Sequence, residues 1–466
     1  MLKSANLFGI AGLFFLLSLH ACRPYHVRQQ KYIQLVQNEQ FALAEDQLES
    51  SRKAKKKEKH KLLYVLDRGY AAFQQGKWSE SSEWLMKADR LTEDYRKQLG
   101  YDALSLLVNA NVKPYKAEDF EVVLMHYFHT IAFLKQRNFE SALVECRRMN
   151  NSLSDMYFKS STKPKYKDDA FGHLLMGLTY EGSGDINNAF IAYRNAYEIY
   201  KSDYSSFFET LVPNQLKEDL VRTASALGFR NEADFYRKEF KLDSAQLNRP
   251  KPFAEAVIFW QNGLGPIKEQ WSIDFVITQQ AGFIQFNNAG LGLNFAFPLS
   301  NISQQDANNL SNLKVFRIAF PKYISRAPIY QTASVSSNGE SRSFQLAEPI
   351  EKIAFKSLSD RFSREMGLAI LRLAIKKATE YGIRQENKEV GALMGIANAI
   401  TEQADTRYWS TLPASISYMK FSLKEGKNKI IMRATRFDHQ KERVDTITID
   451  AQKGRTYFEV YNTIKP

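Results

Sequence analysis

The residues best suited to do chemistry lie close together near the C-terminus. Glu402, Asp405 and Arg407 are followed by Trp409. Neighbouring carboxylates can take up different pKa values and exchange protons with a substrate, and an arginine beside them can bind an anion. The same residues could instead form a buried ion-pair and capping network that locks a helix to the first terminal strand, with Trp409 covering it. We favour this structural interpretation and assign no catalytic residue, while the acid/base site is kept as the alternative.

Other reactive side chains are few, because the chain contains 2 Cys and 7 His. Cys146 is expected to pack as a small apolar residue between helices. His126 and His129 are three residues apart on one predicted helix, but no third ligand lies near them in the sequence, so we predict packing or surface roles and no metal or cofactor. Zincin, Walker and nucleophile-elbow motifs are absent, which disfavours an enzyme without excluding one.

The N-terminus carries the features of an export signal. Lys3 precedes an apolar run, Leu7–Leu19, which is too short to span a membrane and ends near the small residue Ala21. The sequence Leu-His-Ala-Cys that ends at Cys22 resembles a bacterial lipobox, in which the cysteine becomes the lipidated N-terminus. We therefore predict a lipoprotein signal peptide at residues 1–21 and lipidation of Cys22, and an ordinary signal peptide is the alternative.

The residues after Cys22 indicate a location and a charge pattern. Aspartate directly after the cysteine resembles an inner-membrane retention signal, and Arg23 stands there instead, which favours the outer membrane with the protein facing the periplasm. The net charge of +13 is concentrated partly in a basic run, Ser51–Lys61. An exported protein rarely meets nucleic acid, so we interpret this run as a solvated helix face, with attraction to anionic lipid headgroups as the alternative.

One template recurs four times between about residues 60 and 240. A small residue is followed by partners at offsets 7, 12, 16 and 19, as expected for two antiparallel helices with a tight turn between them. The copies begin at Gly69, Thr130, Gly177 and Val221. This pattern resembles the tetratricopeptide family, whose solenoids bind peptides or protein segments on the concave face. The wide spacing of the copies predicts insertions that interrupt the solenoid, such as residues 150–169.

The pattern changes after a linker at residues 242–252. Short β-rich runs at 257–260, 273–276 and 315–318 precede a helical pattern at 355–381 and an apolar stretch at 391–400, which we expect to be core, with contact to a membrane as the alternative. Four further strands, which we expect to form a small antiparallel sheet, follow at 416–423, 429–433, 444–449 and 456–461.

The predicted fold class is therefore a multidomain α+β protein, with an all-α tetratricopeptide-like solenoid followed by a mixed α+β domain. The predicted divisions are 1–21 signal peptide, 22–60 anchor and basic linker or helix, 61–241 repeats, 242–252 linker and 253–466 α+β domain.

The anchor, the repeats, the 401–413 segment and the Asn262–Lys268 turn together resemble an uncharacterised family of bacterial tetratricopeptide lipoproteins. The resemblance implies architecture and location but no activity. Lipoproteins with such repeats serve in outer-membrane protein assembly and in control of cell-wall enzymes. We therefore predict a scaffold for envelope proteins or peptides, and the alternative is an enzyme or glycan-binding protein that acts on the cell wall or on polysaccharide.

Overall fold

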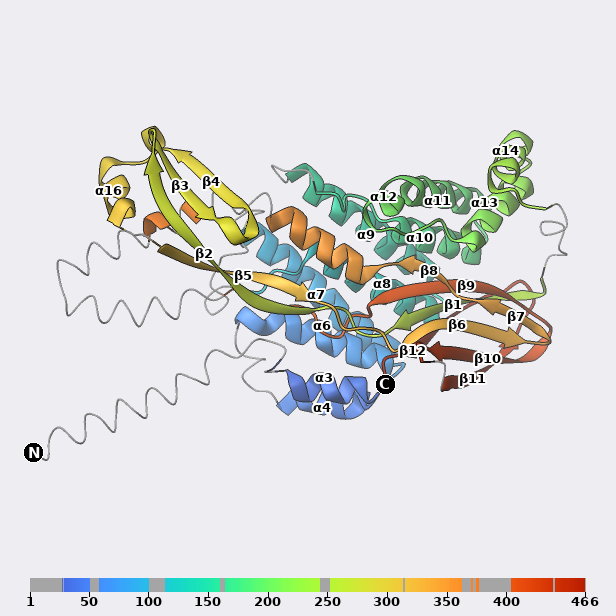
Figure 1. Cartoon of the computed structure of the whole chain (residues 1–466). Helices are drawn as coiled ribbons and strands as arrows, with labels where there is room; N and C mark the ends of the chain where they lie inside the picture. The colour runs from blue at the N-terminus through green and yellow to red at the C-terminus, as the bar shows by residue number, and fades with distance from the viewer. Residues whose placement is uncertain are drawn as a thin grey trace, which may run out of the picture.

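The first half of the chain folds into helices and the second half mainly into strands (Figure 1). The computed structural model describes residues 27, 29–50, 58–99, 114–159, 164–243, 252–312, 315–362, 370–371, 374–376, 404–438 and 441–465. No helix among these residues is long and apolar enough to cross a membrane. The signal peptide, Cys22, Glu402, most of the linker and the 391–400 stretch lie outside the described residues.

The N-terminal half consists of antiparallel helical hairpins, which confirms the tetratricopeptide-like prediction; we call the four hairpins from α6 to α14 the helical array. The hairpins pair α6 with α7, α8 with α9, α10 with α11 and α13 with α14. The helices are α3 Gln30–Gln37, α4 Phe41–Ser50, α6 Glu58–Gln74, α7 Trp78–Leu99, α8 Asp119–Lys135, α9 Phe139–Lys159, α10 Ala170–Ser183, α11 Ile186–Ile199, η2 Tyr200–Tyr204, α12 Ser205–Phe207, α13 Asn214–Ala226 and α14 Arg230–Phe240.

Each hairpin turns at the position that the template predicts. Gly76, Gly184 and Gly228 have φ of 73°, 90° and 75°, and Arg137 at the equivalent place has φ of 61°. This left-handed conformation ends a helix with little strain when the residue is glycine, which explains why three of the four copies use glycine.

The small residues that open the template lie against the large residues at offset 16. A Cβ atom on Gly177 would stand 2.4 Å from Cδ1 of Tyr193, and one on Gly69 would stand 2.8 Å from Cδ2 of Leu85. The residues at offset 16 therefore fill the seam inside their own hairpin.

Two boundaries differ from the sequence-based expectation. Helices α3 and α4 pack against α6, with Tyr32, Val36 and Leu48 in the same core, so helical packing begins well before residue 61. The first residues of the insertion expected at 150–169 do not interrupt the hairpin, because they belong to α9, which continues to Lys159. The last residue of the expected insertion, Asp169, begins the next hairpin: its carboxylate accepts a hydrogen bond from the Gly172 amide and caps α10.

The C-terminal half forms three four-stranded sheets with strand orders β12-β1-β9-β8, β11-β10-β6-β7 and β4-β3-β2-β5. The strands are β1 Ala254–Asn262, β2 Ile267–Gln280, β3 Phe283–Asn288, β4 Leu293–Pro298, β5 Val315–Ile324, β6 Tyr330–Ser337, β7 Glu340–Ser343, β8 Gln345–Glu348, β9 Ser415–Leu423, β10 Gly426–Arg436, β11 Glu442–Ala451 and β12 Thr456–Thr463.

The four terminal strands exist where the sequence predicts them, but they do not form one small antiparallel sheet. Strands β9 and β12 flank β1, and β12 pairs with β1 in parallel. Strands β10 and β11 belong to the second sheet, beside β6. The prediction failed because alternation along a strand identifies its two faces and not its neighbours.

The third sheet projects away from the helices as an arm (Figure 1). One of its faces buries Phe275, Phe286 and Phe316 against α16 (Gln304–Asn312) and against the helical residues Ile370 and Ala374. Of the predicted 355–381 helix, Phe362, Ile370 and Ala374 pack on this arm, whereas Leu358 belongs to the core shared with the helical array.

Candidate functional site

The sheet that contains β1 covers the first helices of the hairpins. Gln261 Nε2 on β1 donates a hydrogen bond of 3.0 Å to the Tyr127 hydroxyl on α8. Phe259 packs edge-on against Phe171 of α10, with ring centroids 6.1 Å apart. One hydrophobic core joins the helices to this sheet. The helix face that would bind a peptide in a solenoid is therefore occupied by the chain itself.

The sequence-predicted site residues lie in the segment 404–414, which runs between α6 and α8. Arg407 is 2% exposed and donates from Nε to both Asp405 carboxylate oxygens, at 2.9 and 3.1 Å. Its Nη1 donates to the Lys59 carbonyl on α6 at 2.6 Å, and its guanidinium lies 5.4 Å from the Tyr115 ring centroid.

This arrangement is a structural ion pair that ties the segment to α6. A substrate anion cannot reach a guanidinium that is buried and already bonded on three sides, so the acid/base alternative loses two of its residues.

Trp409 lies in the same interface and is buried. Its backbone N–H donates to Glu121 Oε1 on α8 at 2.7 Å, and its ring centroid lies 5.7 Å from that of Phe128. Two residues later, the Thr411 hydroxyl donates to Asp67 Oδ1 on α6 at 3.4 Å. Trp409 thus fills the space between two helices of the array, and it does not cover an open site.

Two carboxyls next to this segment, Asp67 and Glu121, are buried, and neither forms an ion pair with a cation among the described residues. Burial, with repulsion from Glu121, raises the pKa of Asp67 to about 8. Burial and the nearby Glu118 carboxylate raise the pKa of Glu121 to about 7. Glu118 differs because, although burial opposes its charge, Arg361 and Lys268 lower its pKa to about 2. Both Asp67 and Glu121 therefore hold protons in the folded state that they release on unfolding near neutral pH.

We expect the stability of the protein to fall as the pH rises from 5 to 8. The stabilisation from protonated Asp67 is complete below its unfolded pKa and is lost as the pH rises toward the folded value of about 8. Asp67→Asn should remove the part of this dependence that Asp67 contributes, so its stability relative to the wild type should rise by about 1 kcal/mol per pH unit over that range. Urea unfolding at several pH values measures the difference.

The matched control is Asp46→Asn, which changes an exposed carboxyl on α4. Its stability should track that of the wild type at every pH. A constant difference between Asp67→Asn and the wild type from pH 5 to pH 8 would contradict a protonated Asp67.

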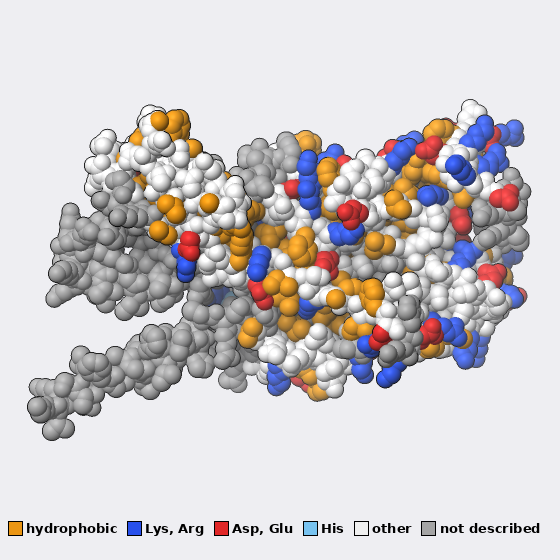
Figure 2. Space-filling view, in the orientation of Figure 1, with side chains coloured by type: hydrophobic (Ala, Val, Ile, Leu, Met, Phe, Trp, Pro, Cys, Tyr) orange, Lys and Arg blue, Asp and Glu red, His pale blue; other side chains and the backbone are white. Residues whose placement is uncertain are grey.

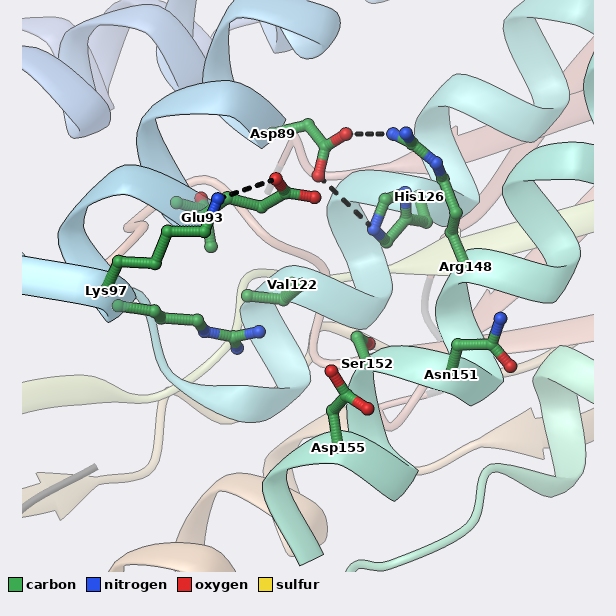
Figure 3. A pocket seen from close by; sticks show the side chains of 11 residues that line it. Asp89, Glu93, Lys97, Val122, His126, Arg148, Asn151, Ser152 and Asp155 are labelled. Carbon is green, nitrogen blue, oxygen red and sulfur yellow. Dashed lines mark hydrogen bonds and ion pairs between the residues drawn. The ribbon is translucent and has the colours of Figure 1, made fainter. Parts of the chain in front are cut away.

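A separate cleft opens on the other side of α8, between α7 and α9 (Figure 3). Its volume is about 360 Å³, in the range of small-molecule pockets. The cleft carries both signs of charge, and its lining residues are Asp89, Thr92, Glu93, Arg96, Lys97, Val122, His126, Arg148, Asn151, Ser152 and Asp155.

His126, on the floor of this cleft, is held by a residue that the sequence analysis missed. Its Nδ1 lies 2.7 Å from Glu145 Oε2 on α9, and His129 Nδ1 lies 3.2 Å from the same oxygen. His126 Nε2 is 3.8 Å from Asp89 Oδ1, and Asp89 forms an ion pair with Arg148. Among the described residues, no group of three or more His, Cys, Asp or Glu side chains could hold a metal ion.

The cleft can hold a polar group but lacks an activated nucleophile among its described residues. The Ser152 hydroxyl donates to the Met149 carbonyl of its own helix at 2.8 Å. Cys146 lies in the helix seam as predicted, where burial raises the pKa of its thiol to about 12. The charged lining of the cleft is suited to binding a polar or charged group.

No protein-family model and no curated protein matches this chain. Among solved structures, the apo form of RapI is 14% identical with a TM-score of 0.31, and the alignment covers 46% of this chain and 65% of RapI.

Tetratricopeptide-like repeats of a putative kinesin light chain from Podosopora anserina are 15% identical with a TM-score of 0.31, covering 48% of this chain and 98% of theirs. NprR in complex with its cognate peptide NprX is 15% identical with a TM-score of 0.19, covering 50% and 73%. These values are too low to transfer a site or a partner.

Proposed function

We propose that this protein is a lipid-anchored scaffold of the bacterial cell envelope, attached to the outer membrane through Cys22 and facing the periplasm. It would hold other envelope proteins in outer-membrane or cell-wall assembly. The observation that carries the scaffold proposal is the single core that joins the helical array to the β1 sheet. A covered inner face makes the array rigid, and a rigid support with exposed outer helices suits docking of folded partners.

The same observation supports a docking site on the outside of the array. Strands β1 and β9 and the 404–414 segment occupy the inner face of the array. We therefore expect partner proteins to dock on the outer helices α7, α9, α11 and α14 and in the cleft between α7 and α9. A scaffold of this kind differs from an open peptide-binding solenoid, in which the inner face stays free for the ligand.

The anchor is tested by changing the proposed lipidation site. Cys22→Ser should move the protein from the membrane fraction to the soluble fraction, because the lipid chains that hold it are never attached. Fractionation followed by immunoblotting measures the distribution, and metabolic labelling with a fatty acid should mark the wild type alone. Equal membrane recovery of both forms would contradict the anchor.

The scaffold function is tested by in-cell photo-crosslinking from outer-helix positions. A crosslinker replacing Asn151 at the cleft should capture a defined envelope protein, whereas one replacing Gln279 on the arm gives the matched background. If no envelope protein is enriched at the cleft or on α11 and α14 over this background, the scaffold proposal fails even when Cys22 proves to be lipidated.

A further inference from the structure

The arm carries far less charge than the rest of the chain. No charged residue stands between Asp274 and Asp306, although charged residues make up 25% of the whole sequence. Figure 2 shows the result, because the visible face of the arm has few red or blue side chains, whereas that of the rest of the molecule has many. Charged side chains are a common means by which proteins keep exposed strands from pairing with other strands, so their absence directs attention to the edges of this sheet.

One edge strand of the arm lacks the usual protection. An edge exposes unpaired backbone N–H and C=O groups, which charged residues, proline or a short strand length commonly shield. The other edge of the arm, β5, carries Arg317, Pro321 and Lys322, and the edge strands of the other two sheets, β7, β8, β11 and β12, all contain charged residues. Strand β4 contains none, and its only proline is its last residue, Pro298. Among the described strands, β4 is therefore the edge best suited to pair with another strand.

The register of β4 on β3 decides which backbone groups point outward. The Leu299 N–H donates to the Gly282 carbonyl at 2.8 Å. Hydrogen-bonded pairs recur at every second residue of an antiparallel ladder, so Phe295 bonds inward to β3, whereas Asn294 and Ala296 direct their N–H and C=O groups away from it. These outward groups are not bonded to any other described segment. The middle of β4 can therefore bond to a further strand without losing a bond to β3.

The side chains of β4 divide into an apolar and an uncharged polar face. Leu293, Phe295 and Phe297 pack against the core of the arm, and all three remain partly exposed. Asn294 and Ala296 lie on the opposite face and are exposed. A strand that pairs with β4 must therefore bring apolar side chains to the first face and small uncharged side chains to the second.

We propose that β4 pairs with β4 of a second copy of this chain, in antiparallel orientation about a two-fold axis at Phe295. This register sets each Phe295 opposite its own copy and Leu293 opposite the partner's Phe297, so partly exposed apolar side chains cover one another. On the other face it sets Asn294 opposite the partner's Ala296, and the outward backbone groups of these two residues bond reciprocally. The two arms then form one continuous sheet.

Charge and shape favour a second copy over a strand of another protein. In a self-paired strand each side chain comes close to its own copy, so a charge near the axis would repel itself, and β3 and β4 contain no charge. The arm projects from one end of the molecule, with β2 running outward along it (Figure 1). A two-fold axis normal to the sheet reverses the second arm, which places the rest of each molecule at opposite ends of the joined sheet.

Self-association is measured by sedimentation velocity of the full-length protein in detergent at increasing concentration. A single strand pair buries a small interface, so we expect a reversible dimer with a dissociation constant in the micromolar range. Ala296→Pro should weaken the dimer at least about tenfold, because proline removes an outward N–H and leaves the bonds to β3 in place. Circular dichroism checks that this variant keeps its fold.

Cysteine trapping tests the register independently of the proline variant. The Cα atoms of a non-hydrogen-bonded antiparallel pair are about 4.5 Å apart, within reach of a disulfide. Phe295→Cys should therefore form an intermolecular disulfide under mild oxidation. The matched control is Leu293→Cys, on the same face of the same strand, which should stay reduced because the two copies of residue 293 lie roughly 14 Å apart along the strands. Cys146 is buried and does not compete.

A wild type that stays monomeric up to high micromolar concentration overturns the proposal, and so does equal trapping of the two cysteine variants. It also fails if a photo-crosslinker at Ala296 captures another envelope protein and not this chain, because the strand that pairs with β4 is then foreign. Pairing of the arms goes beyond the scaffold function, which crosslinking from Asn151 on α9 tests separately. Gln279 remains a suitable background position for that experiment, since it lies on β2 and not on an edge strand.

Discussion

Trp409→Ala should destabilise the protein by about 3–5 kcal/mol. The indole is 2% exposed and fills the interface between the 404–414 segment and the helix that carries Phe128. Its removal leaves a cavity that the packed helices cannot close. No side-chain hydrogen bond is lost in exchange, since the indole N–H has no hydrogen-bond partner among the described residues. Chemical unfolding at constant pH measures the loss.

Trp409→Phe is the matched control, because it keeps an aromatic ring against Phe128 and should retain much of the lost stability. If Trp409 instead covered an accessible site, its truncation would cost little stability and would change ligand binding. A loss below about 1 kcal/mol for Trp409→Ala would contradict the interface described here.

Lys420→Met should be equally costly, at about 3–5 kcal/mol, because it breaks a buried ion cluster between the array and the sheet. Lys420 Nζ on β9 lies 2.9 Å from Glu181 on α10 and 3.0 Å from Asp219 on α13. Burial and Arg222 act to lower the pKa of Lys420, but the Asp219 and Glu181 carboxylates hold it above its ordinary value. When Lys420 is replaced, the buried carboxylates of Glu181 and Asp219 still pair with Arg222 but have lost the positive charge of the lysine.

Lys352→Met supplies the comparison, because the ion pair of Lys352 with Glu209 is exposed and its loss should change stability by about 0.5 kcal/mol or less. Adding Asp219→Asn to Lys420→Met should recover part of the stability by removing one uncompensated charge. Unfolding free energies of the single and double variants give this coupling, and no recovery would contradict a shared cluster.

The repeats could be predicted because the fold of each hairpin depends on residues that are close together in the sequence. A glycine at the turn and a small residue opposite a large one are needed within a single hairpin, and Gly177, Gly184 and Tyr193 stand where that geometry requires them. The strand segments were predictable for the same reason, since alternation and turn glycines such as Gly426 act over a few residues.

Arg407 and Asp405 form an ion pair, and the residues around this pair were not predictable from the sequence. The ion pair was expected against the first terminal strand, whereas Arg407 donates to the carbonyl of Lys59, which lies 348 residues away in the chain. Glu145 was missed as the partner of His126 and His129 for a related reason, because a hairpin turn brings α9 beside α8.

The sequence by itself determined the hairpins and the strands, because each is encoded in residues that are close along the chain. Only the tertiary structure decided which strands pair and that the β1 sheet and Trp409 occupy the inner face of the array. These features depend on residues far apart in the sequence, and their contacts are selected by burial of whole faces and not by any local pattern.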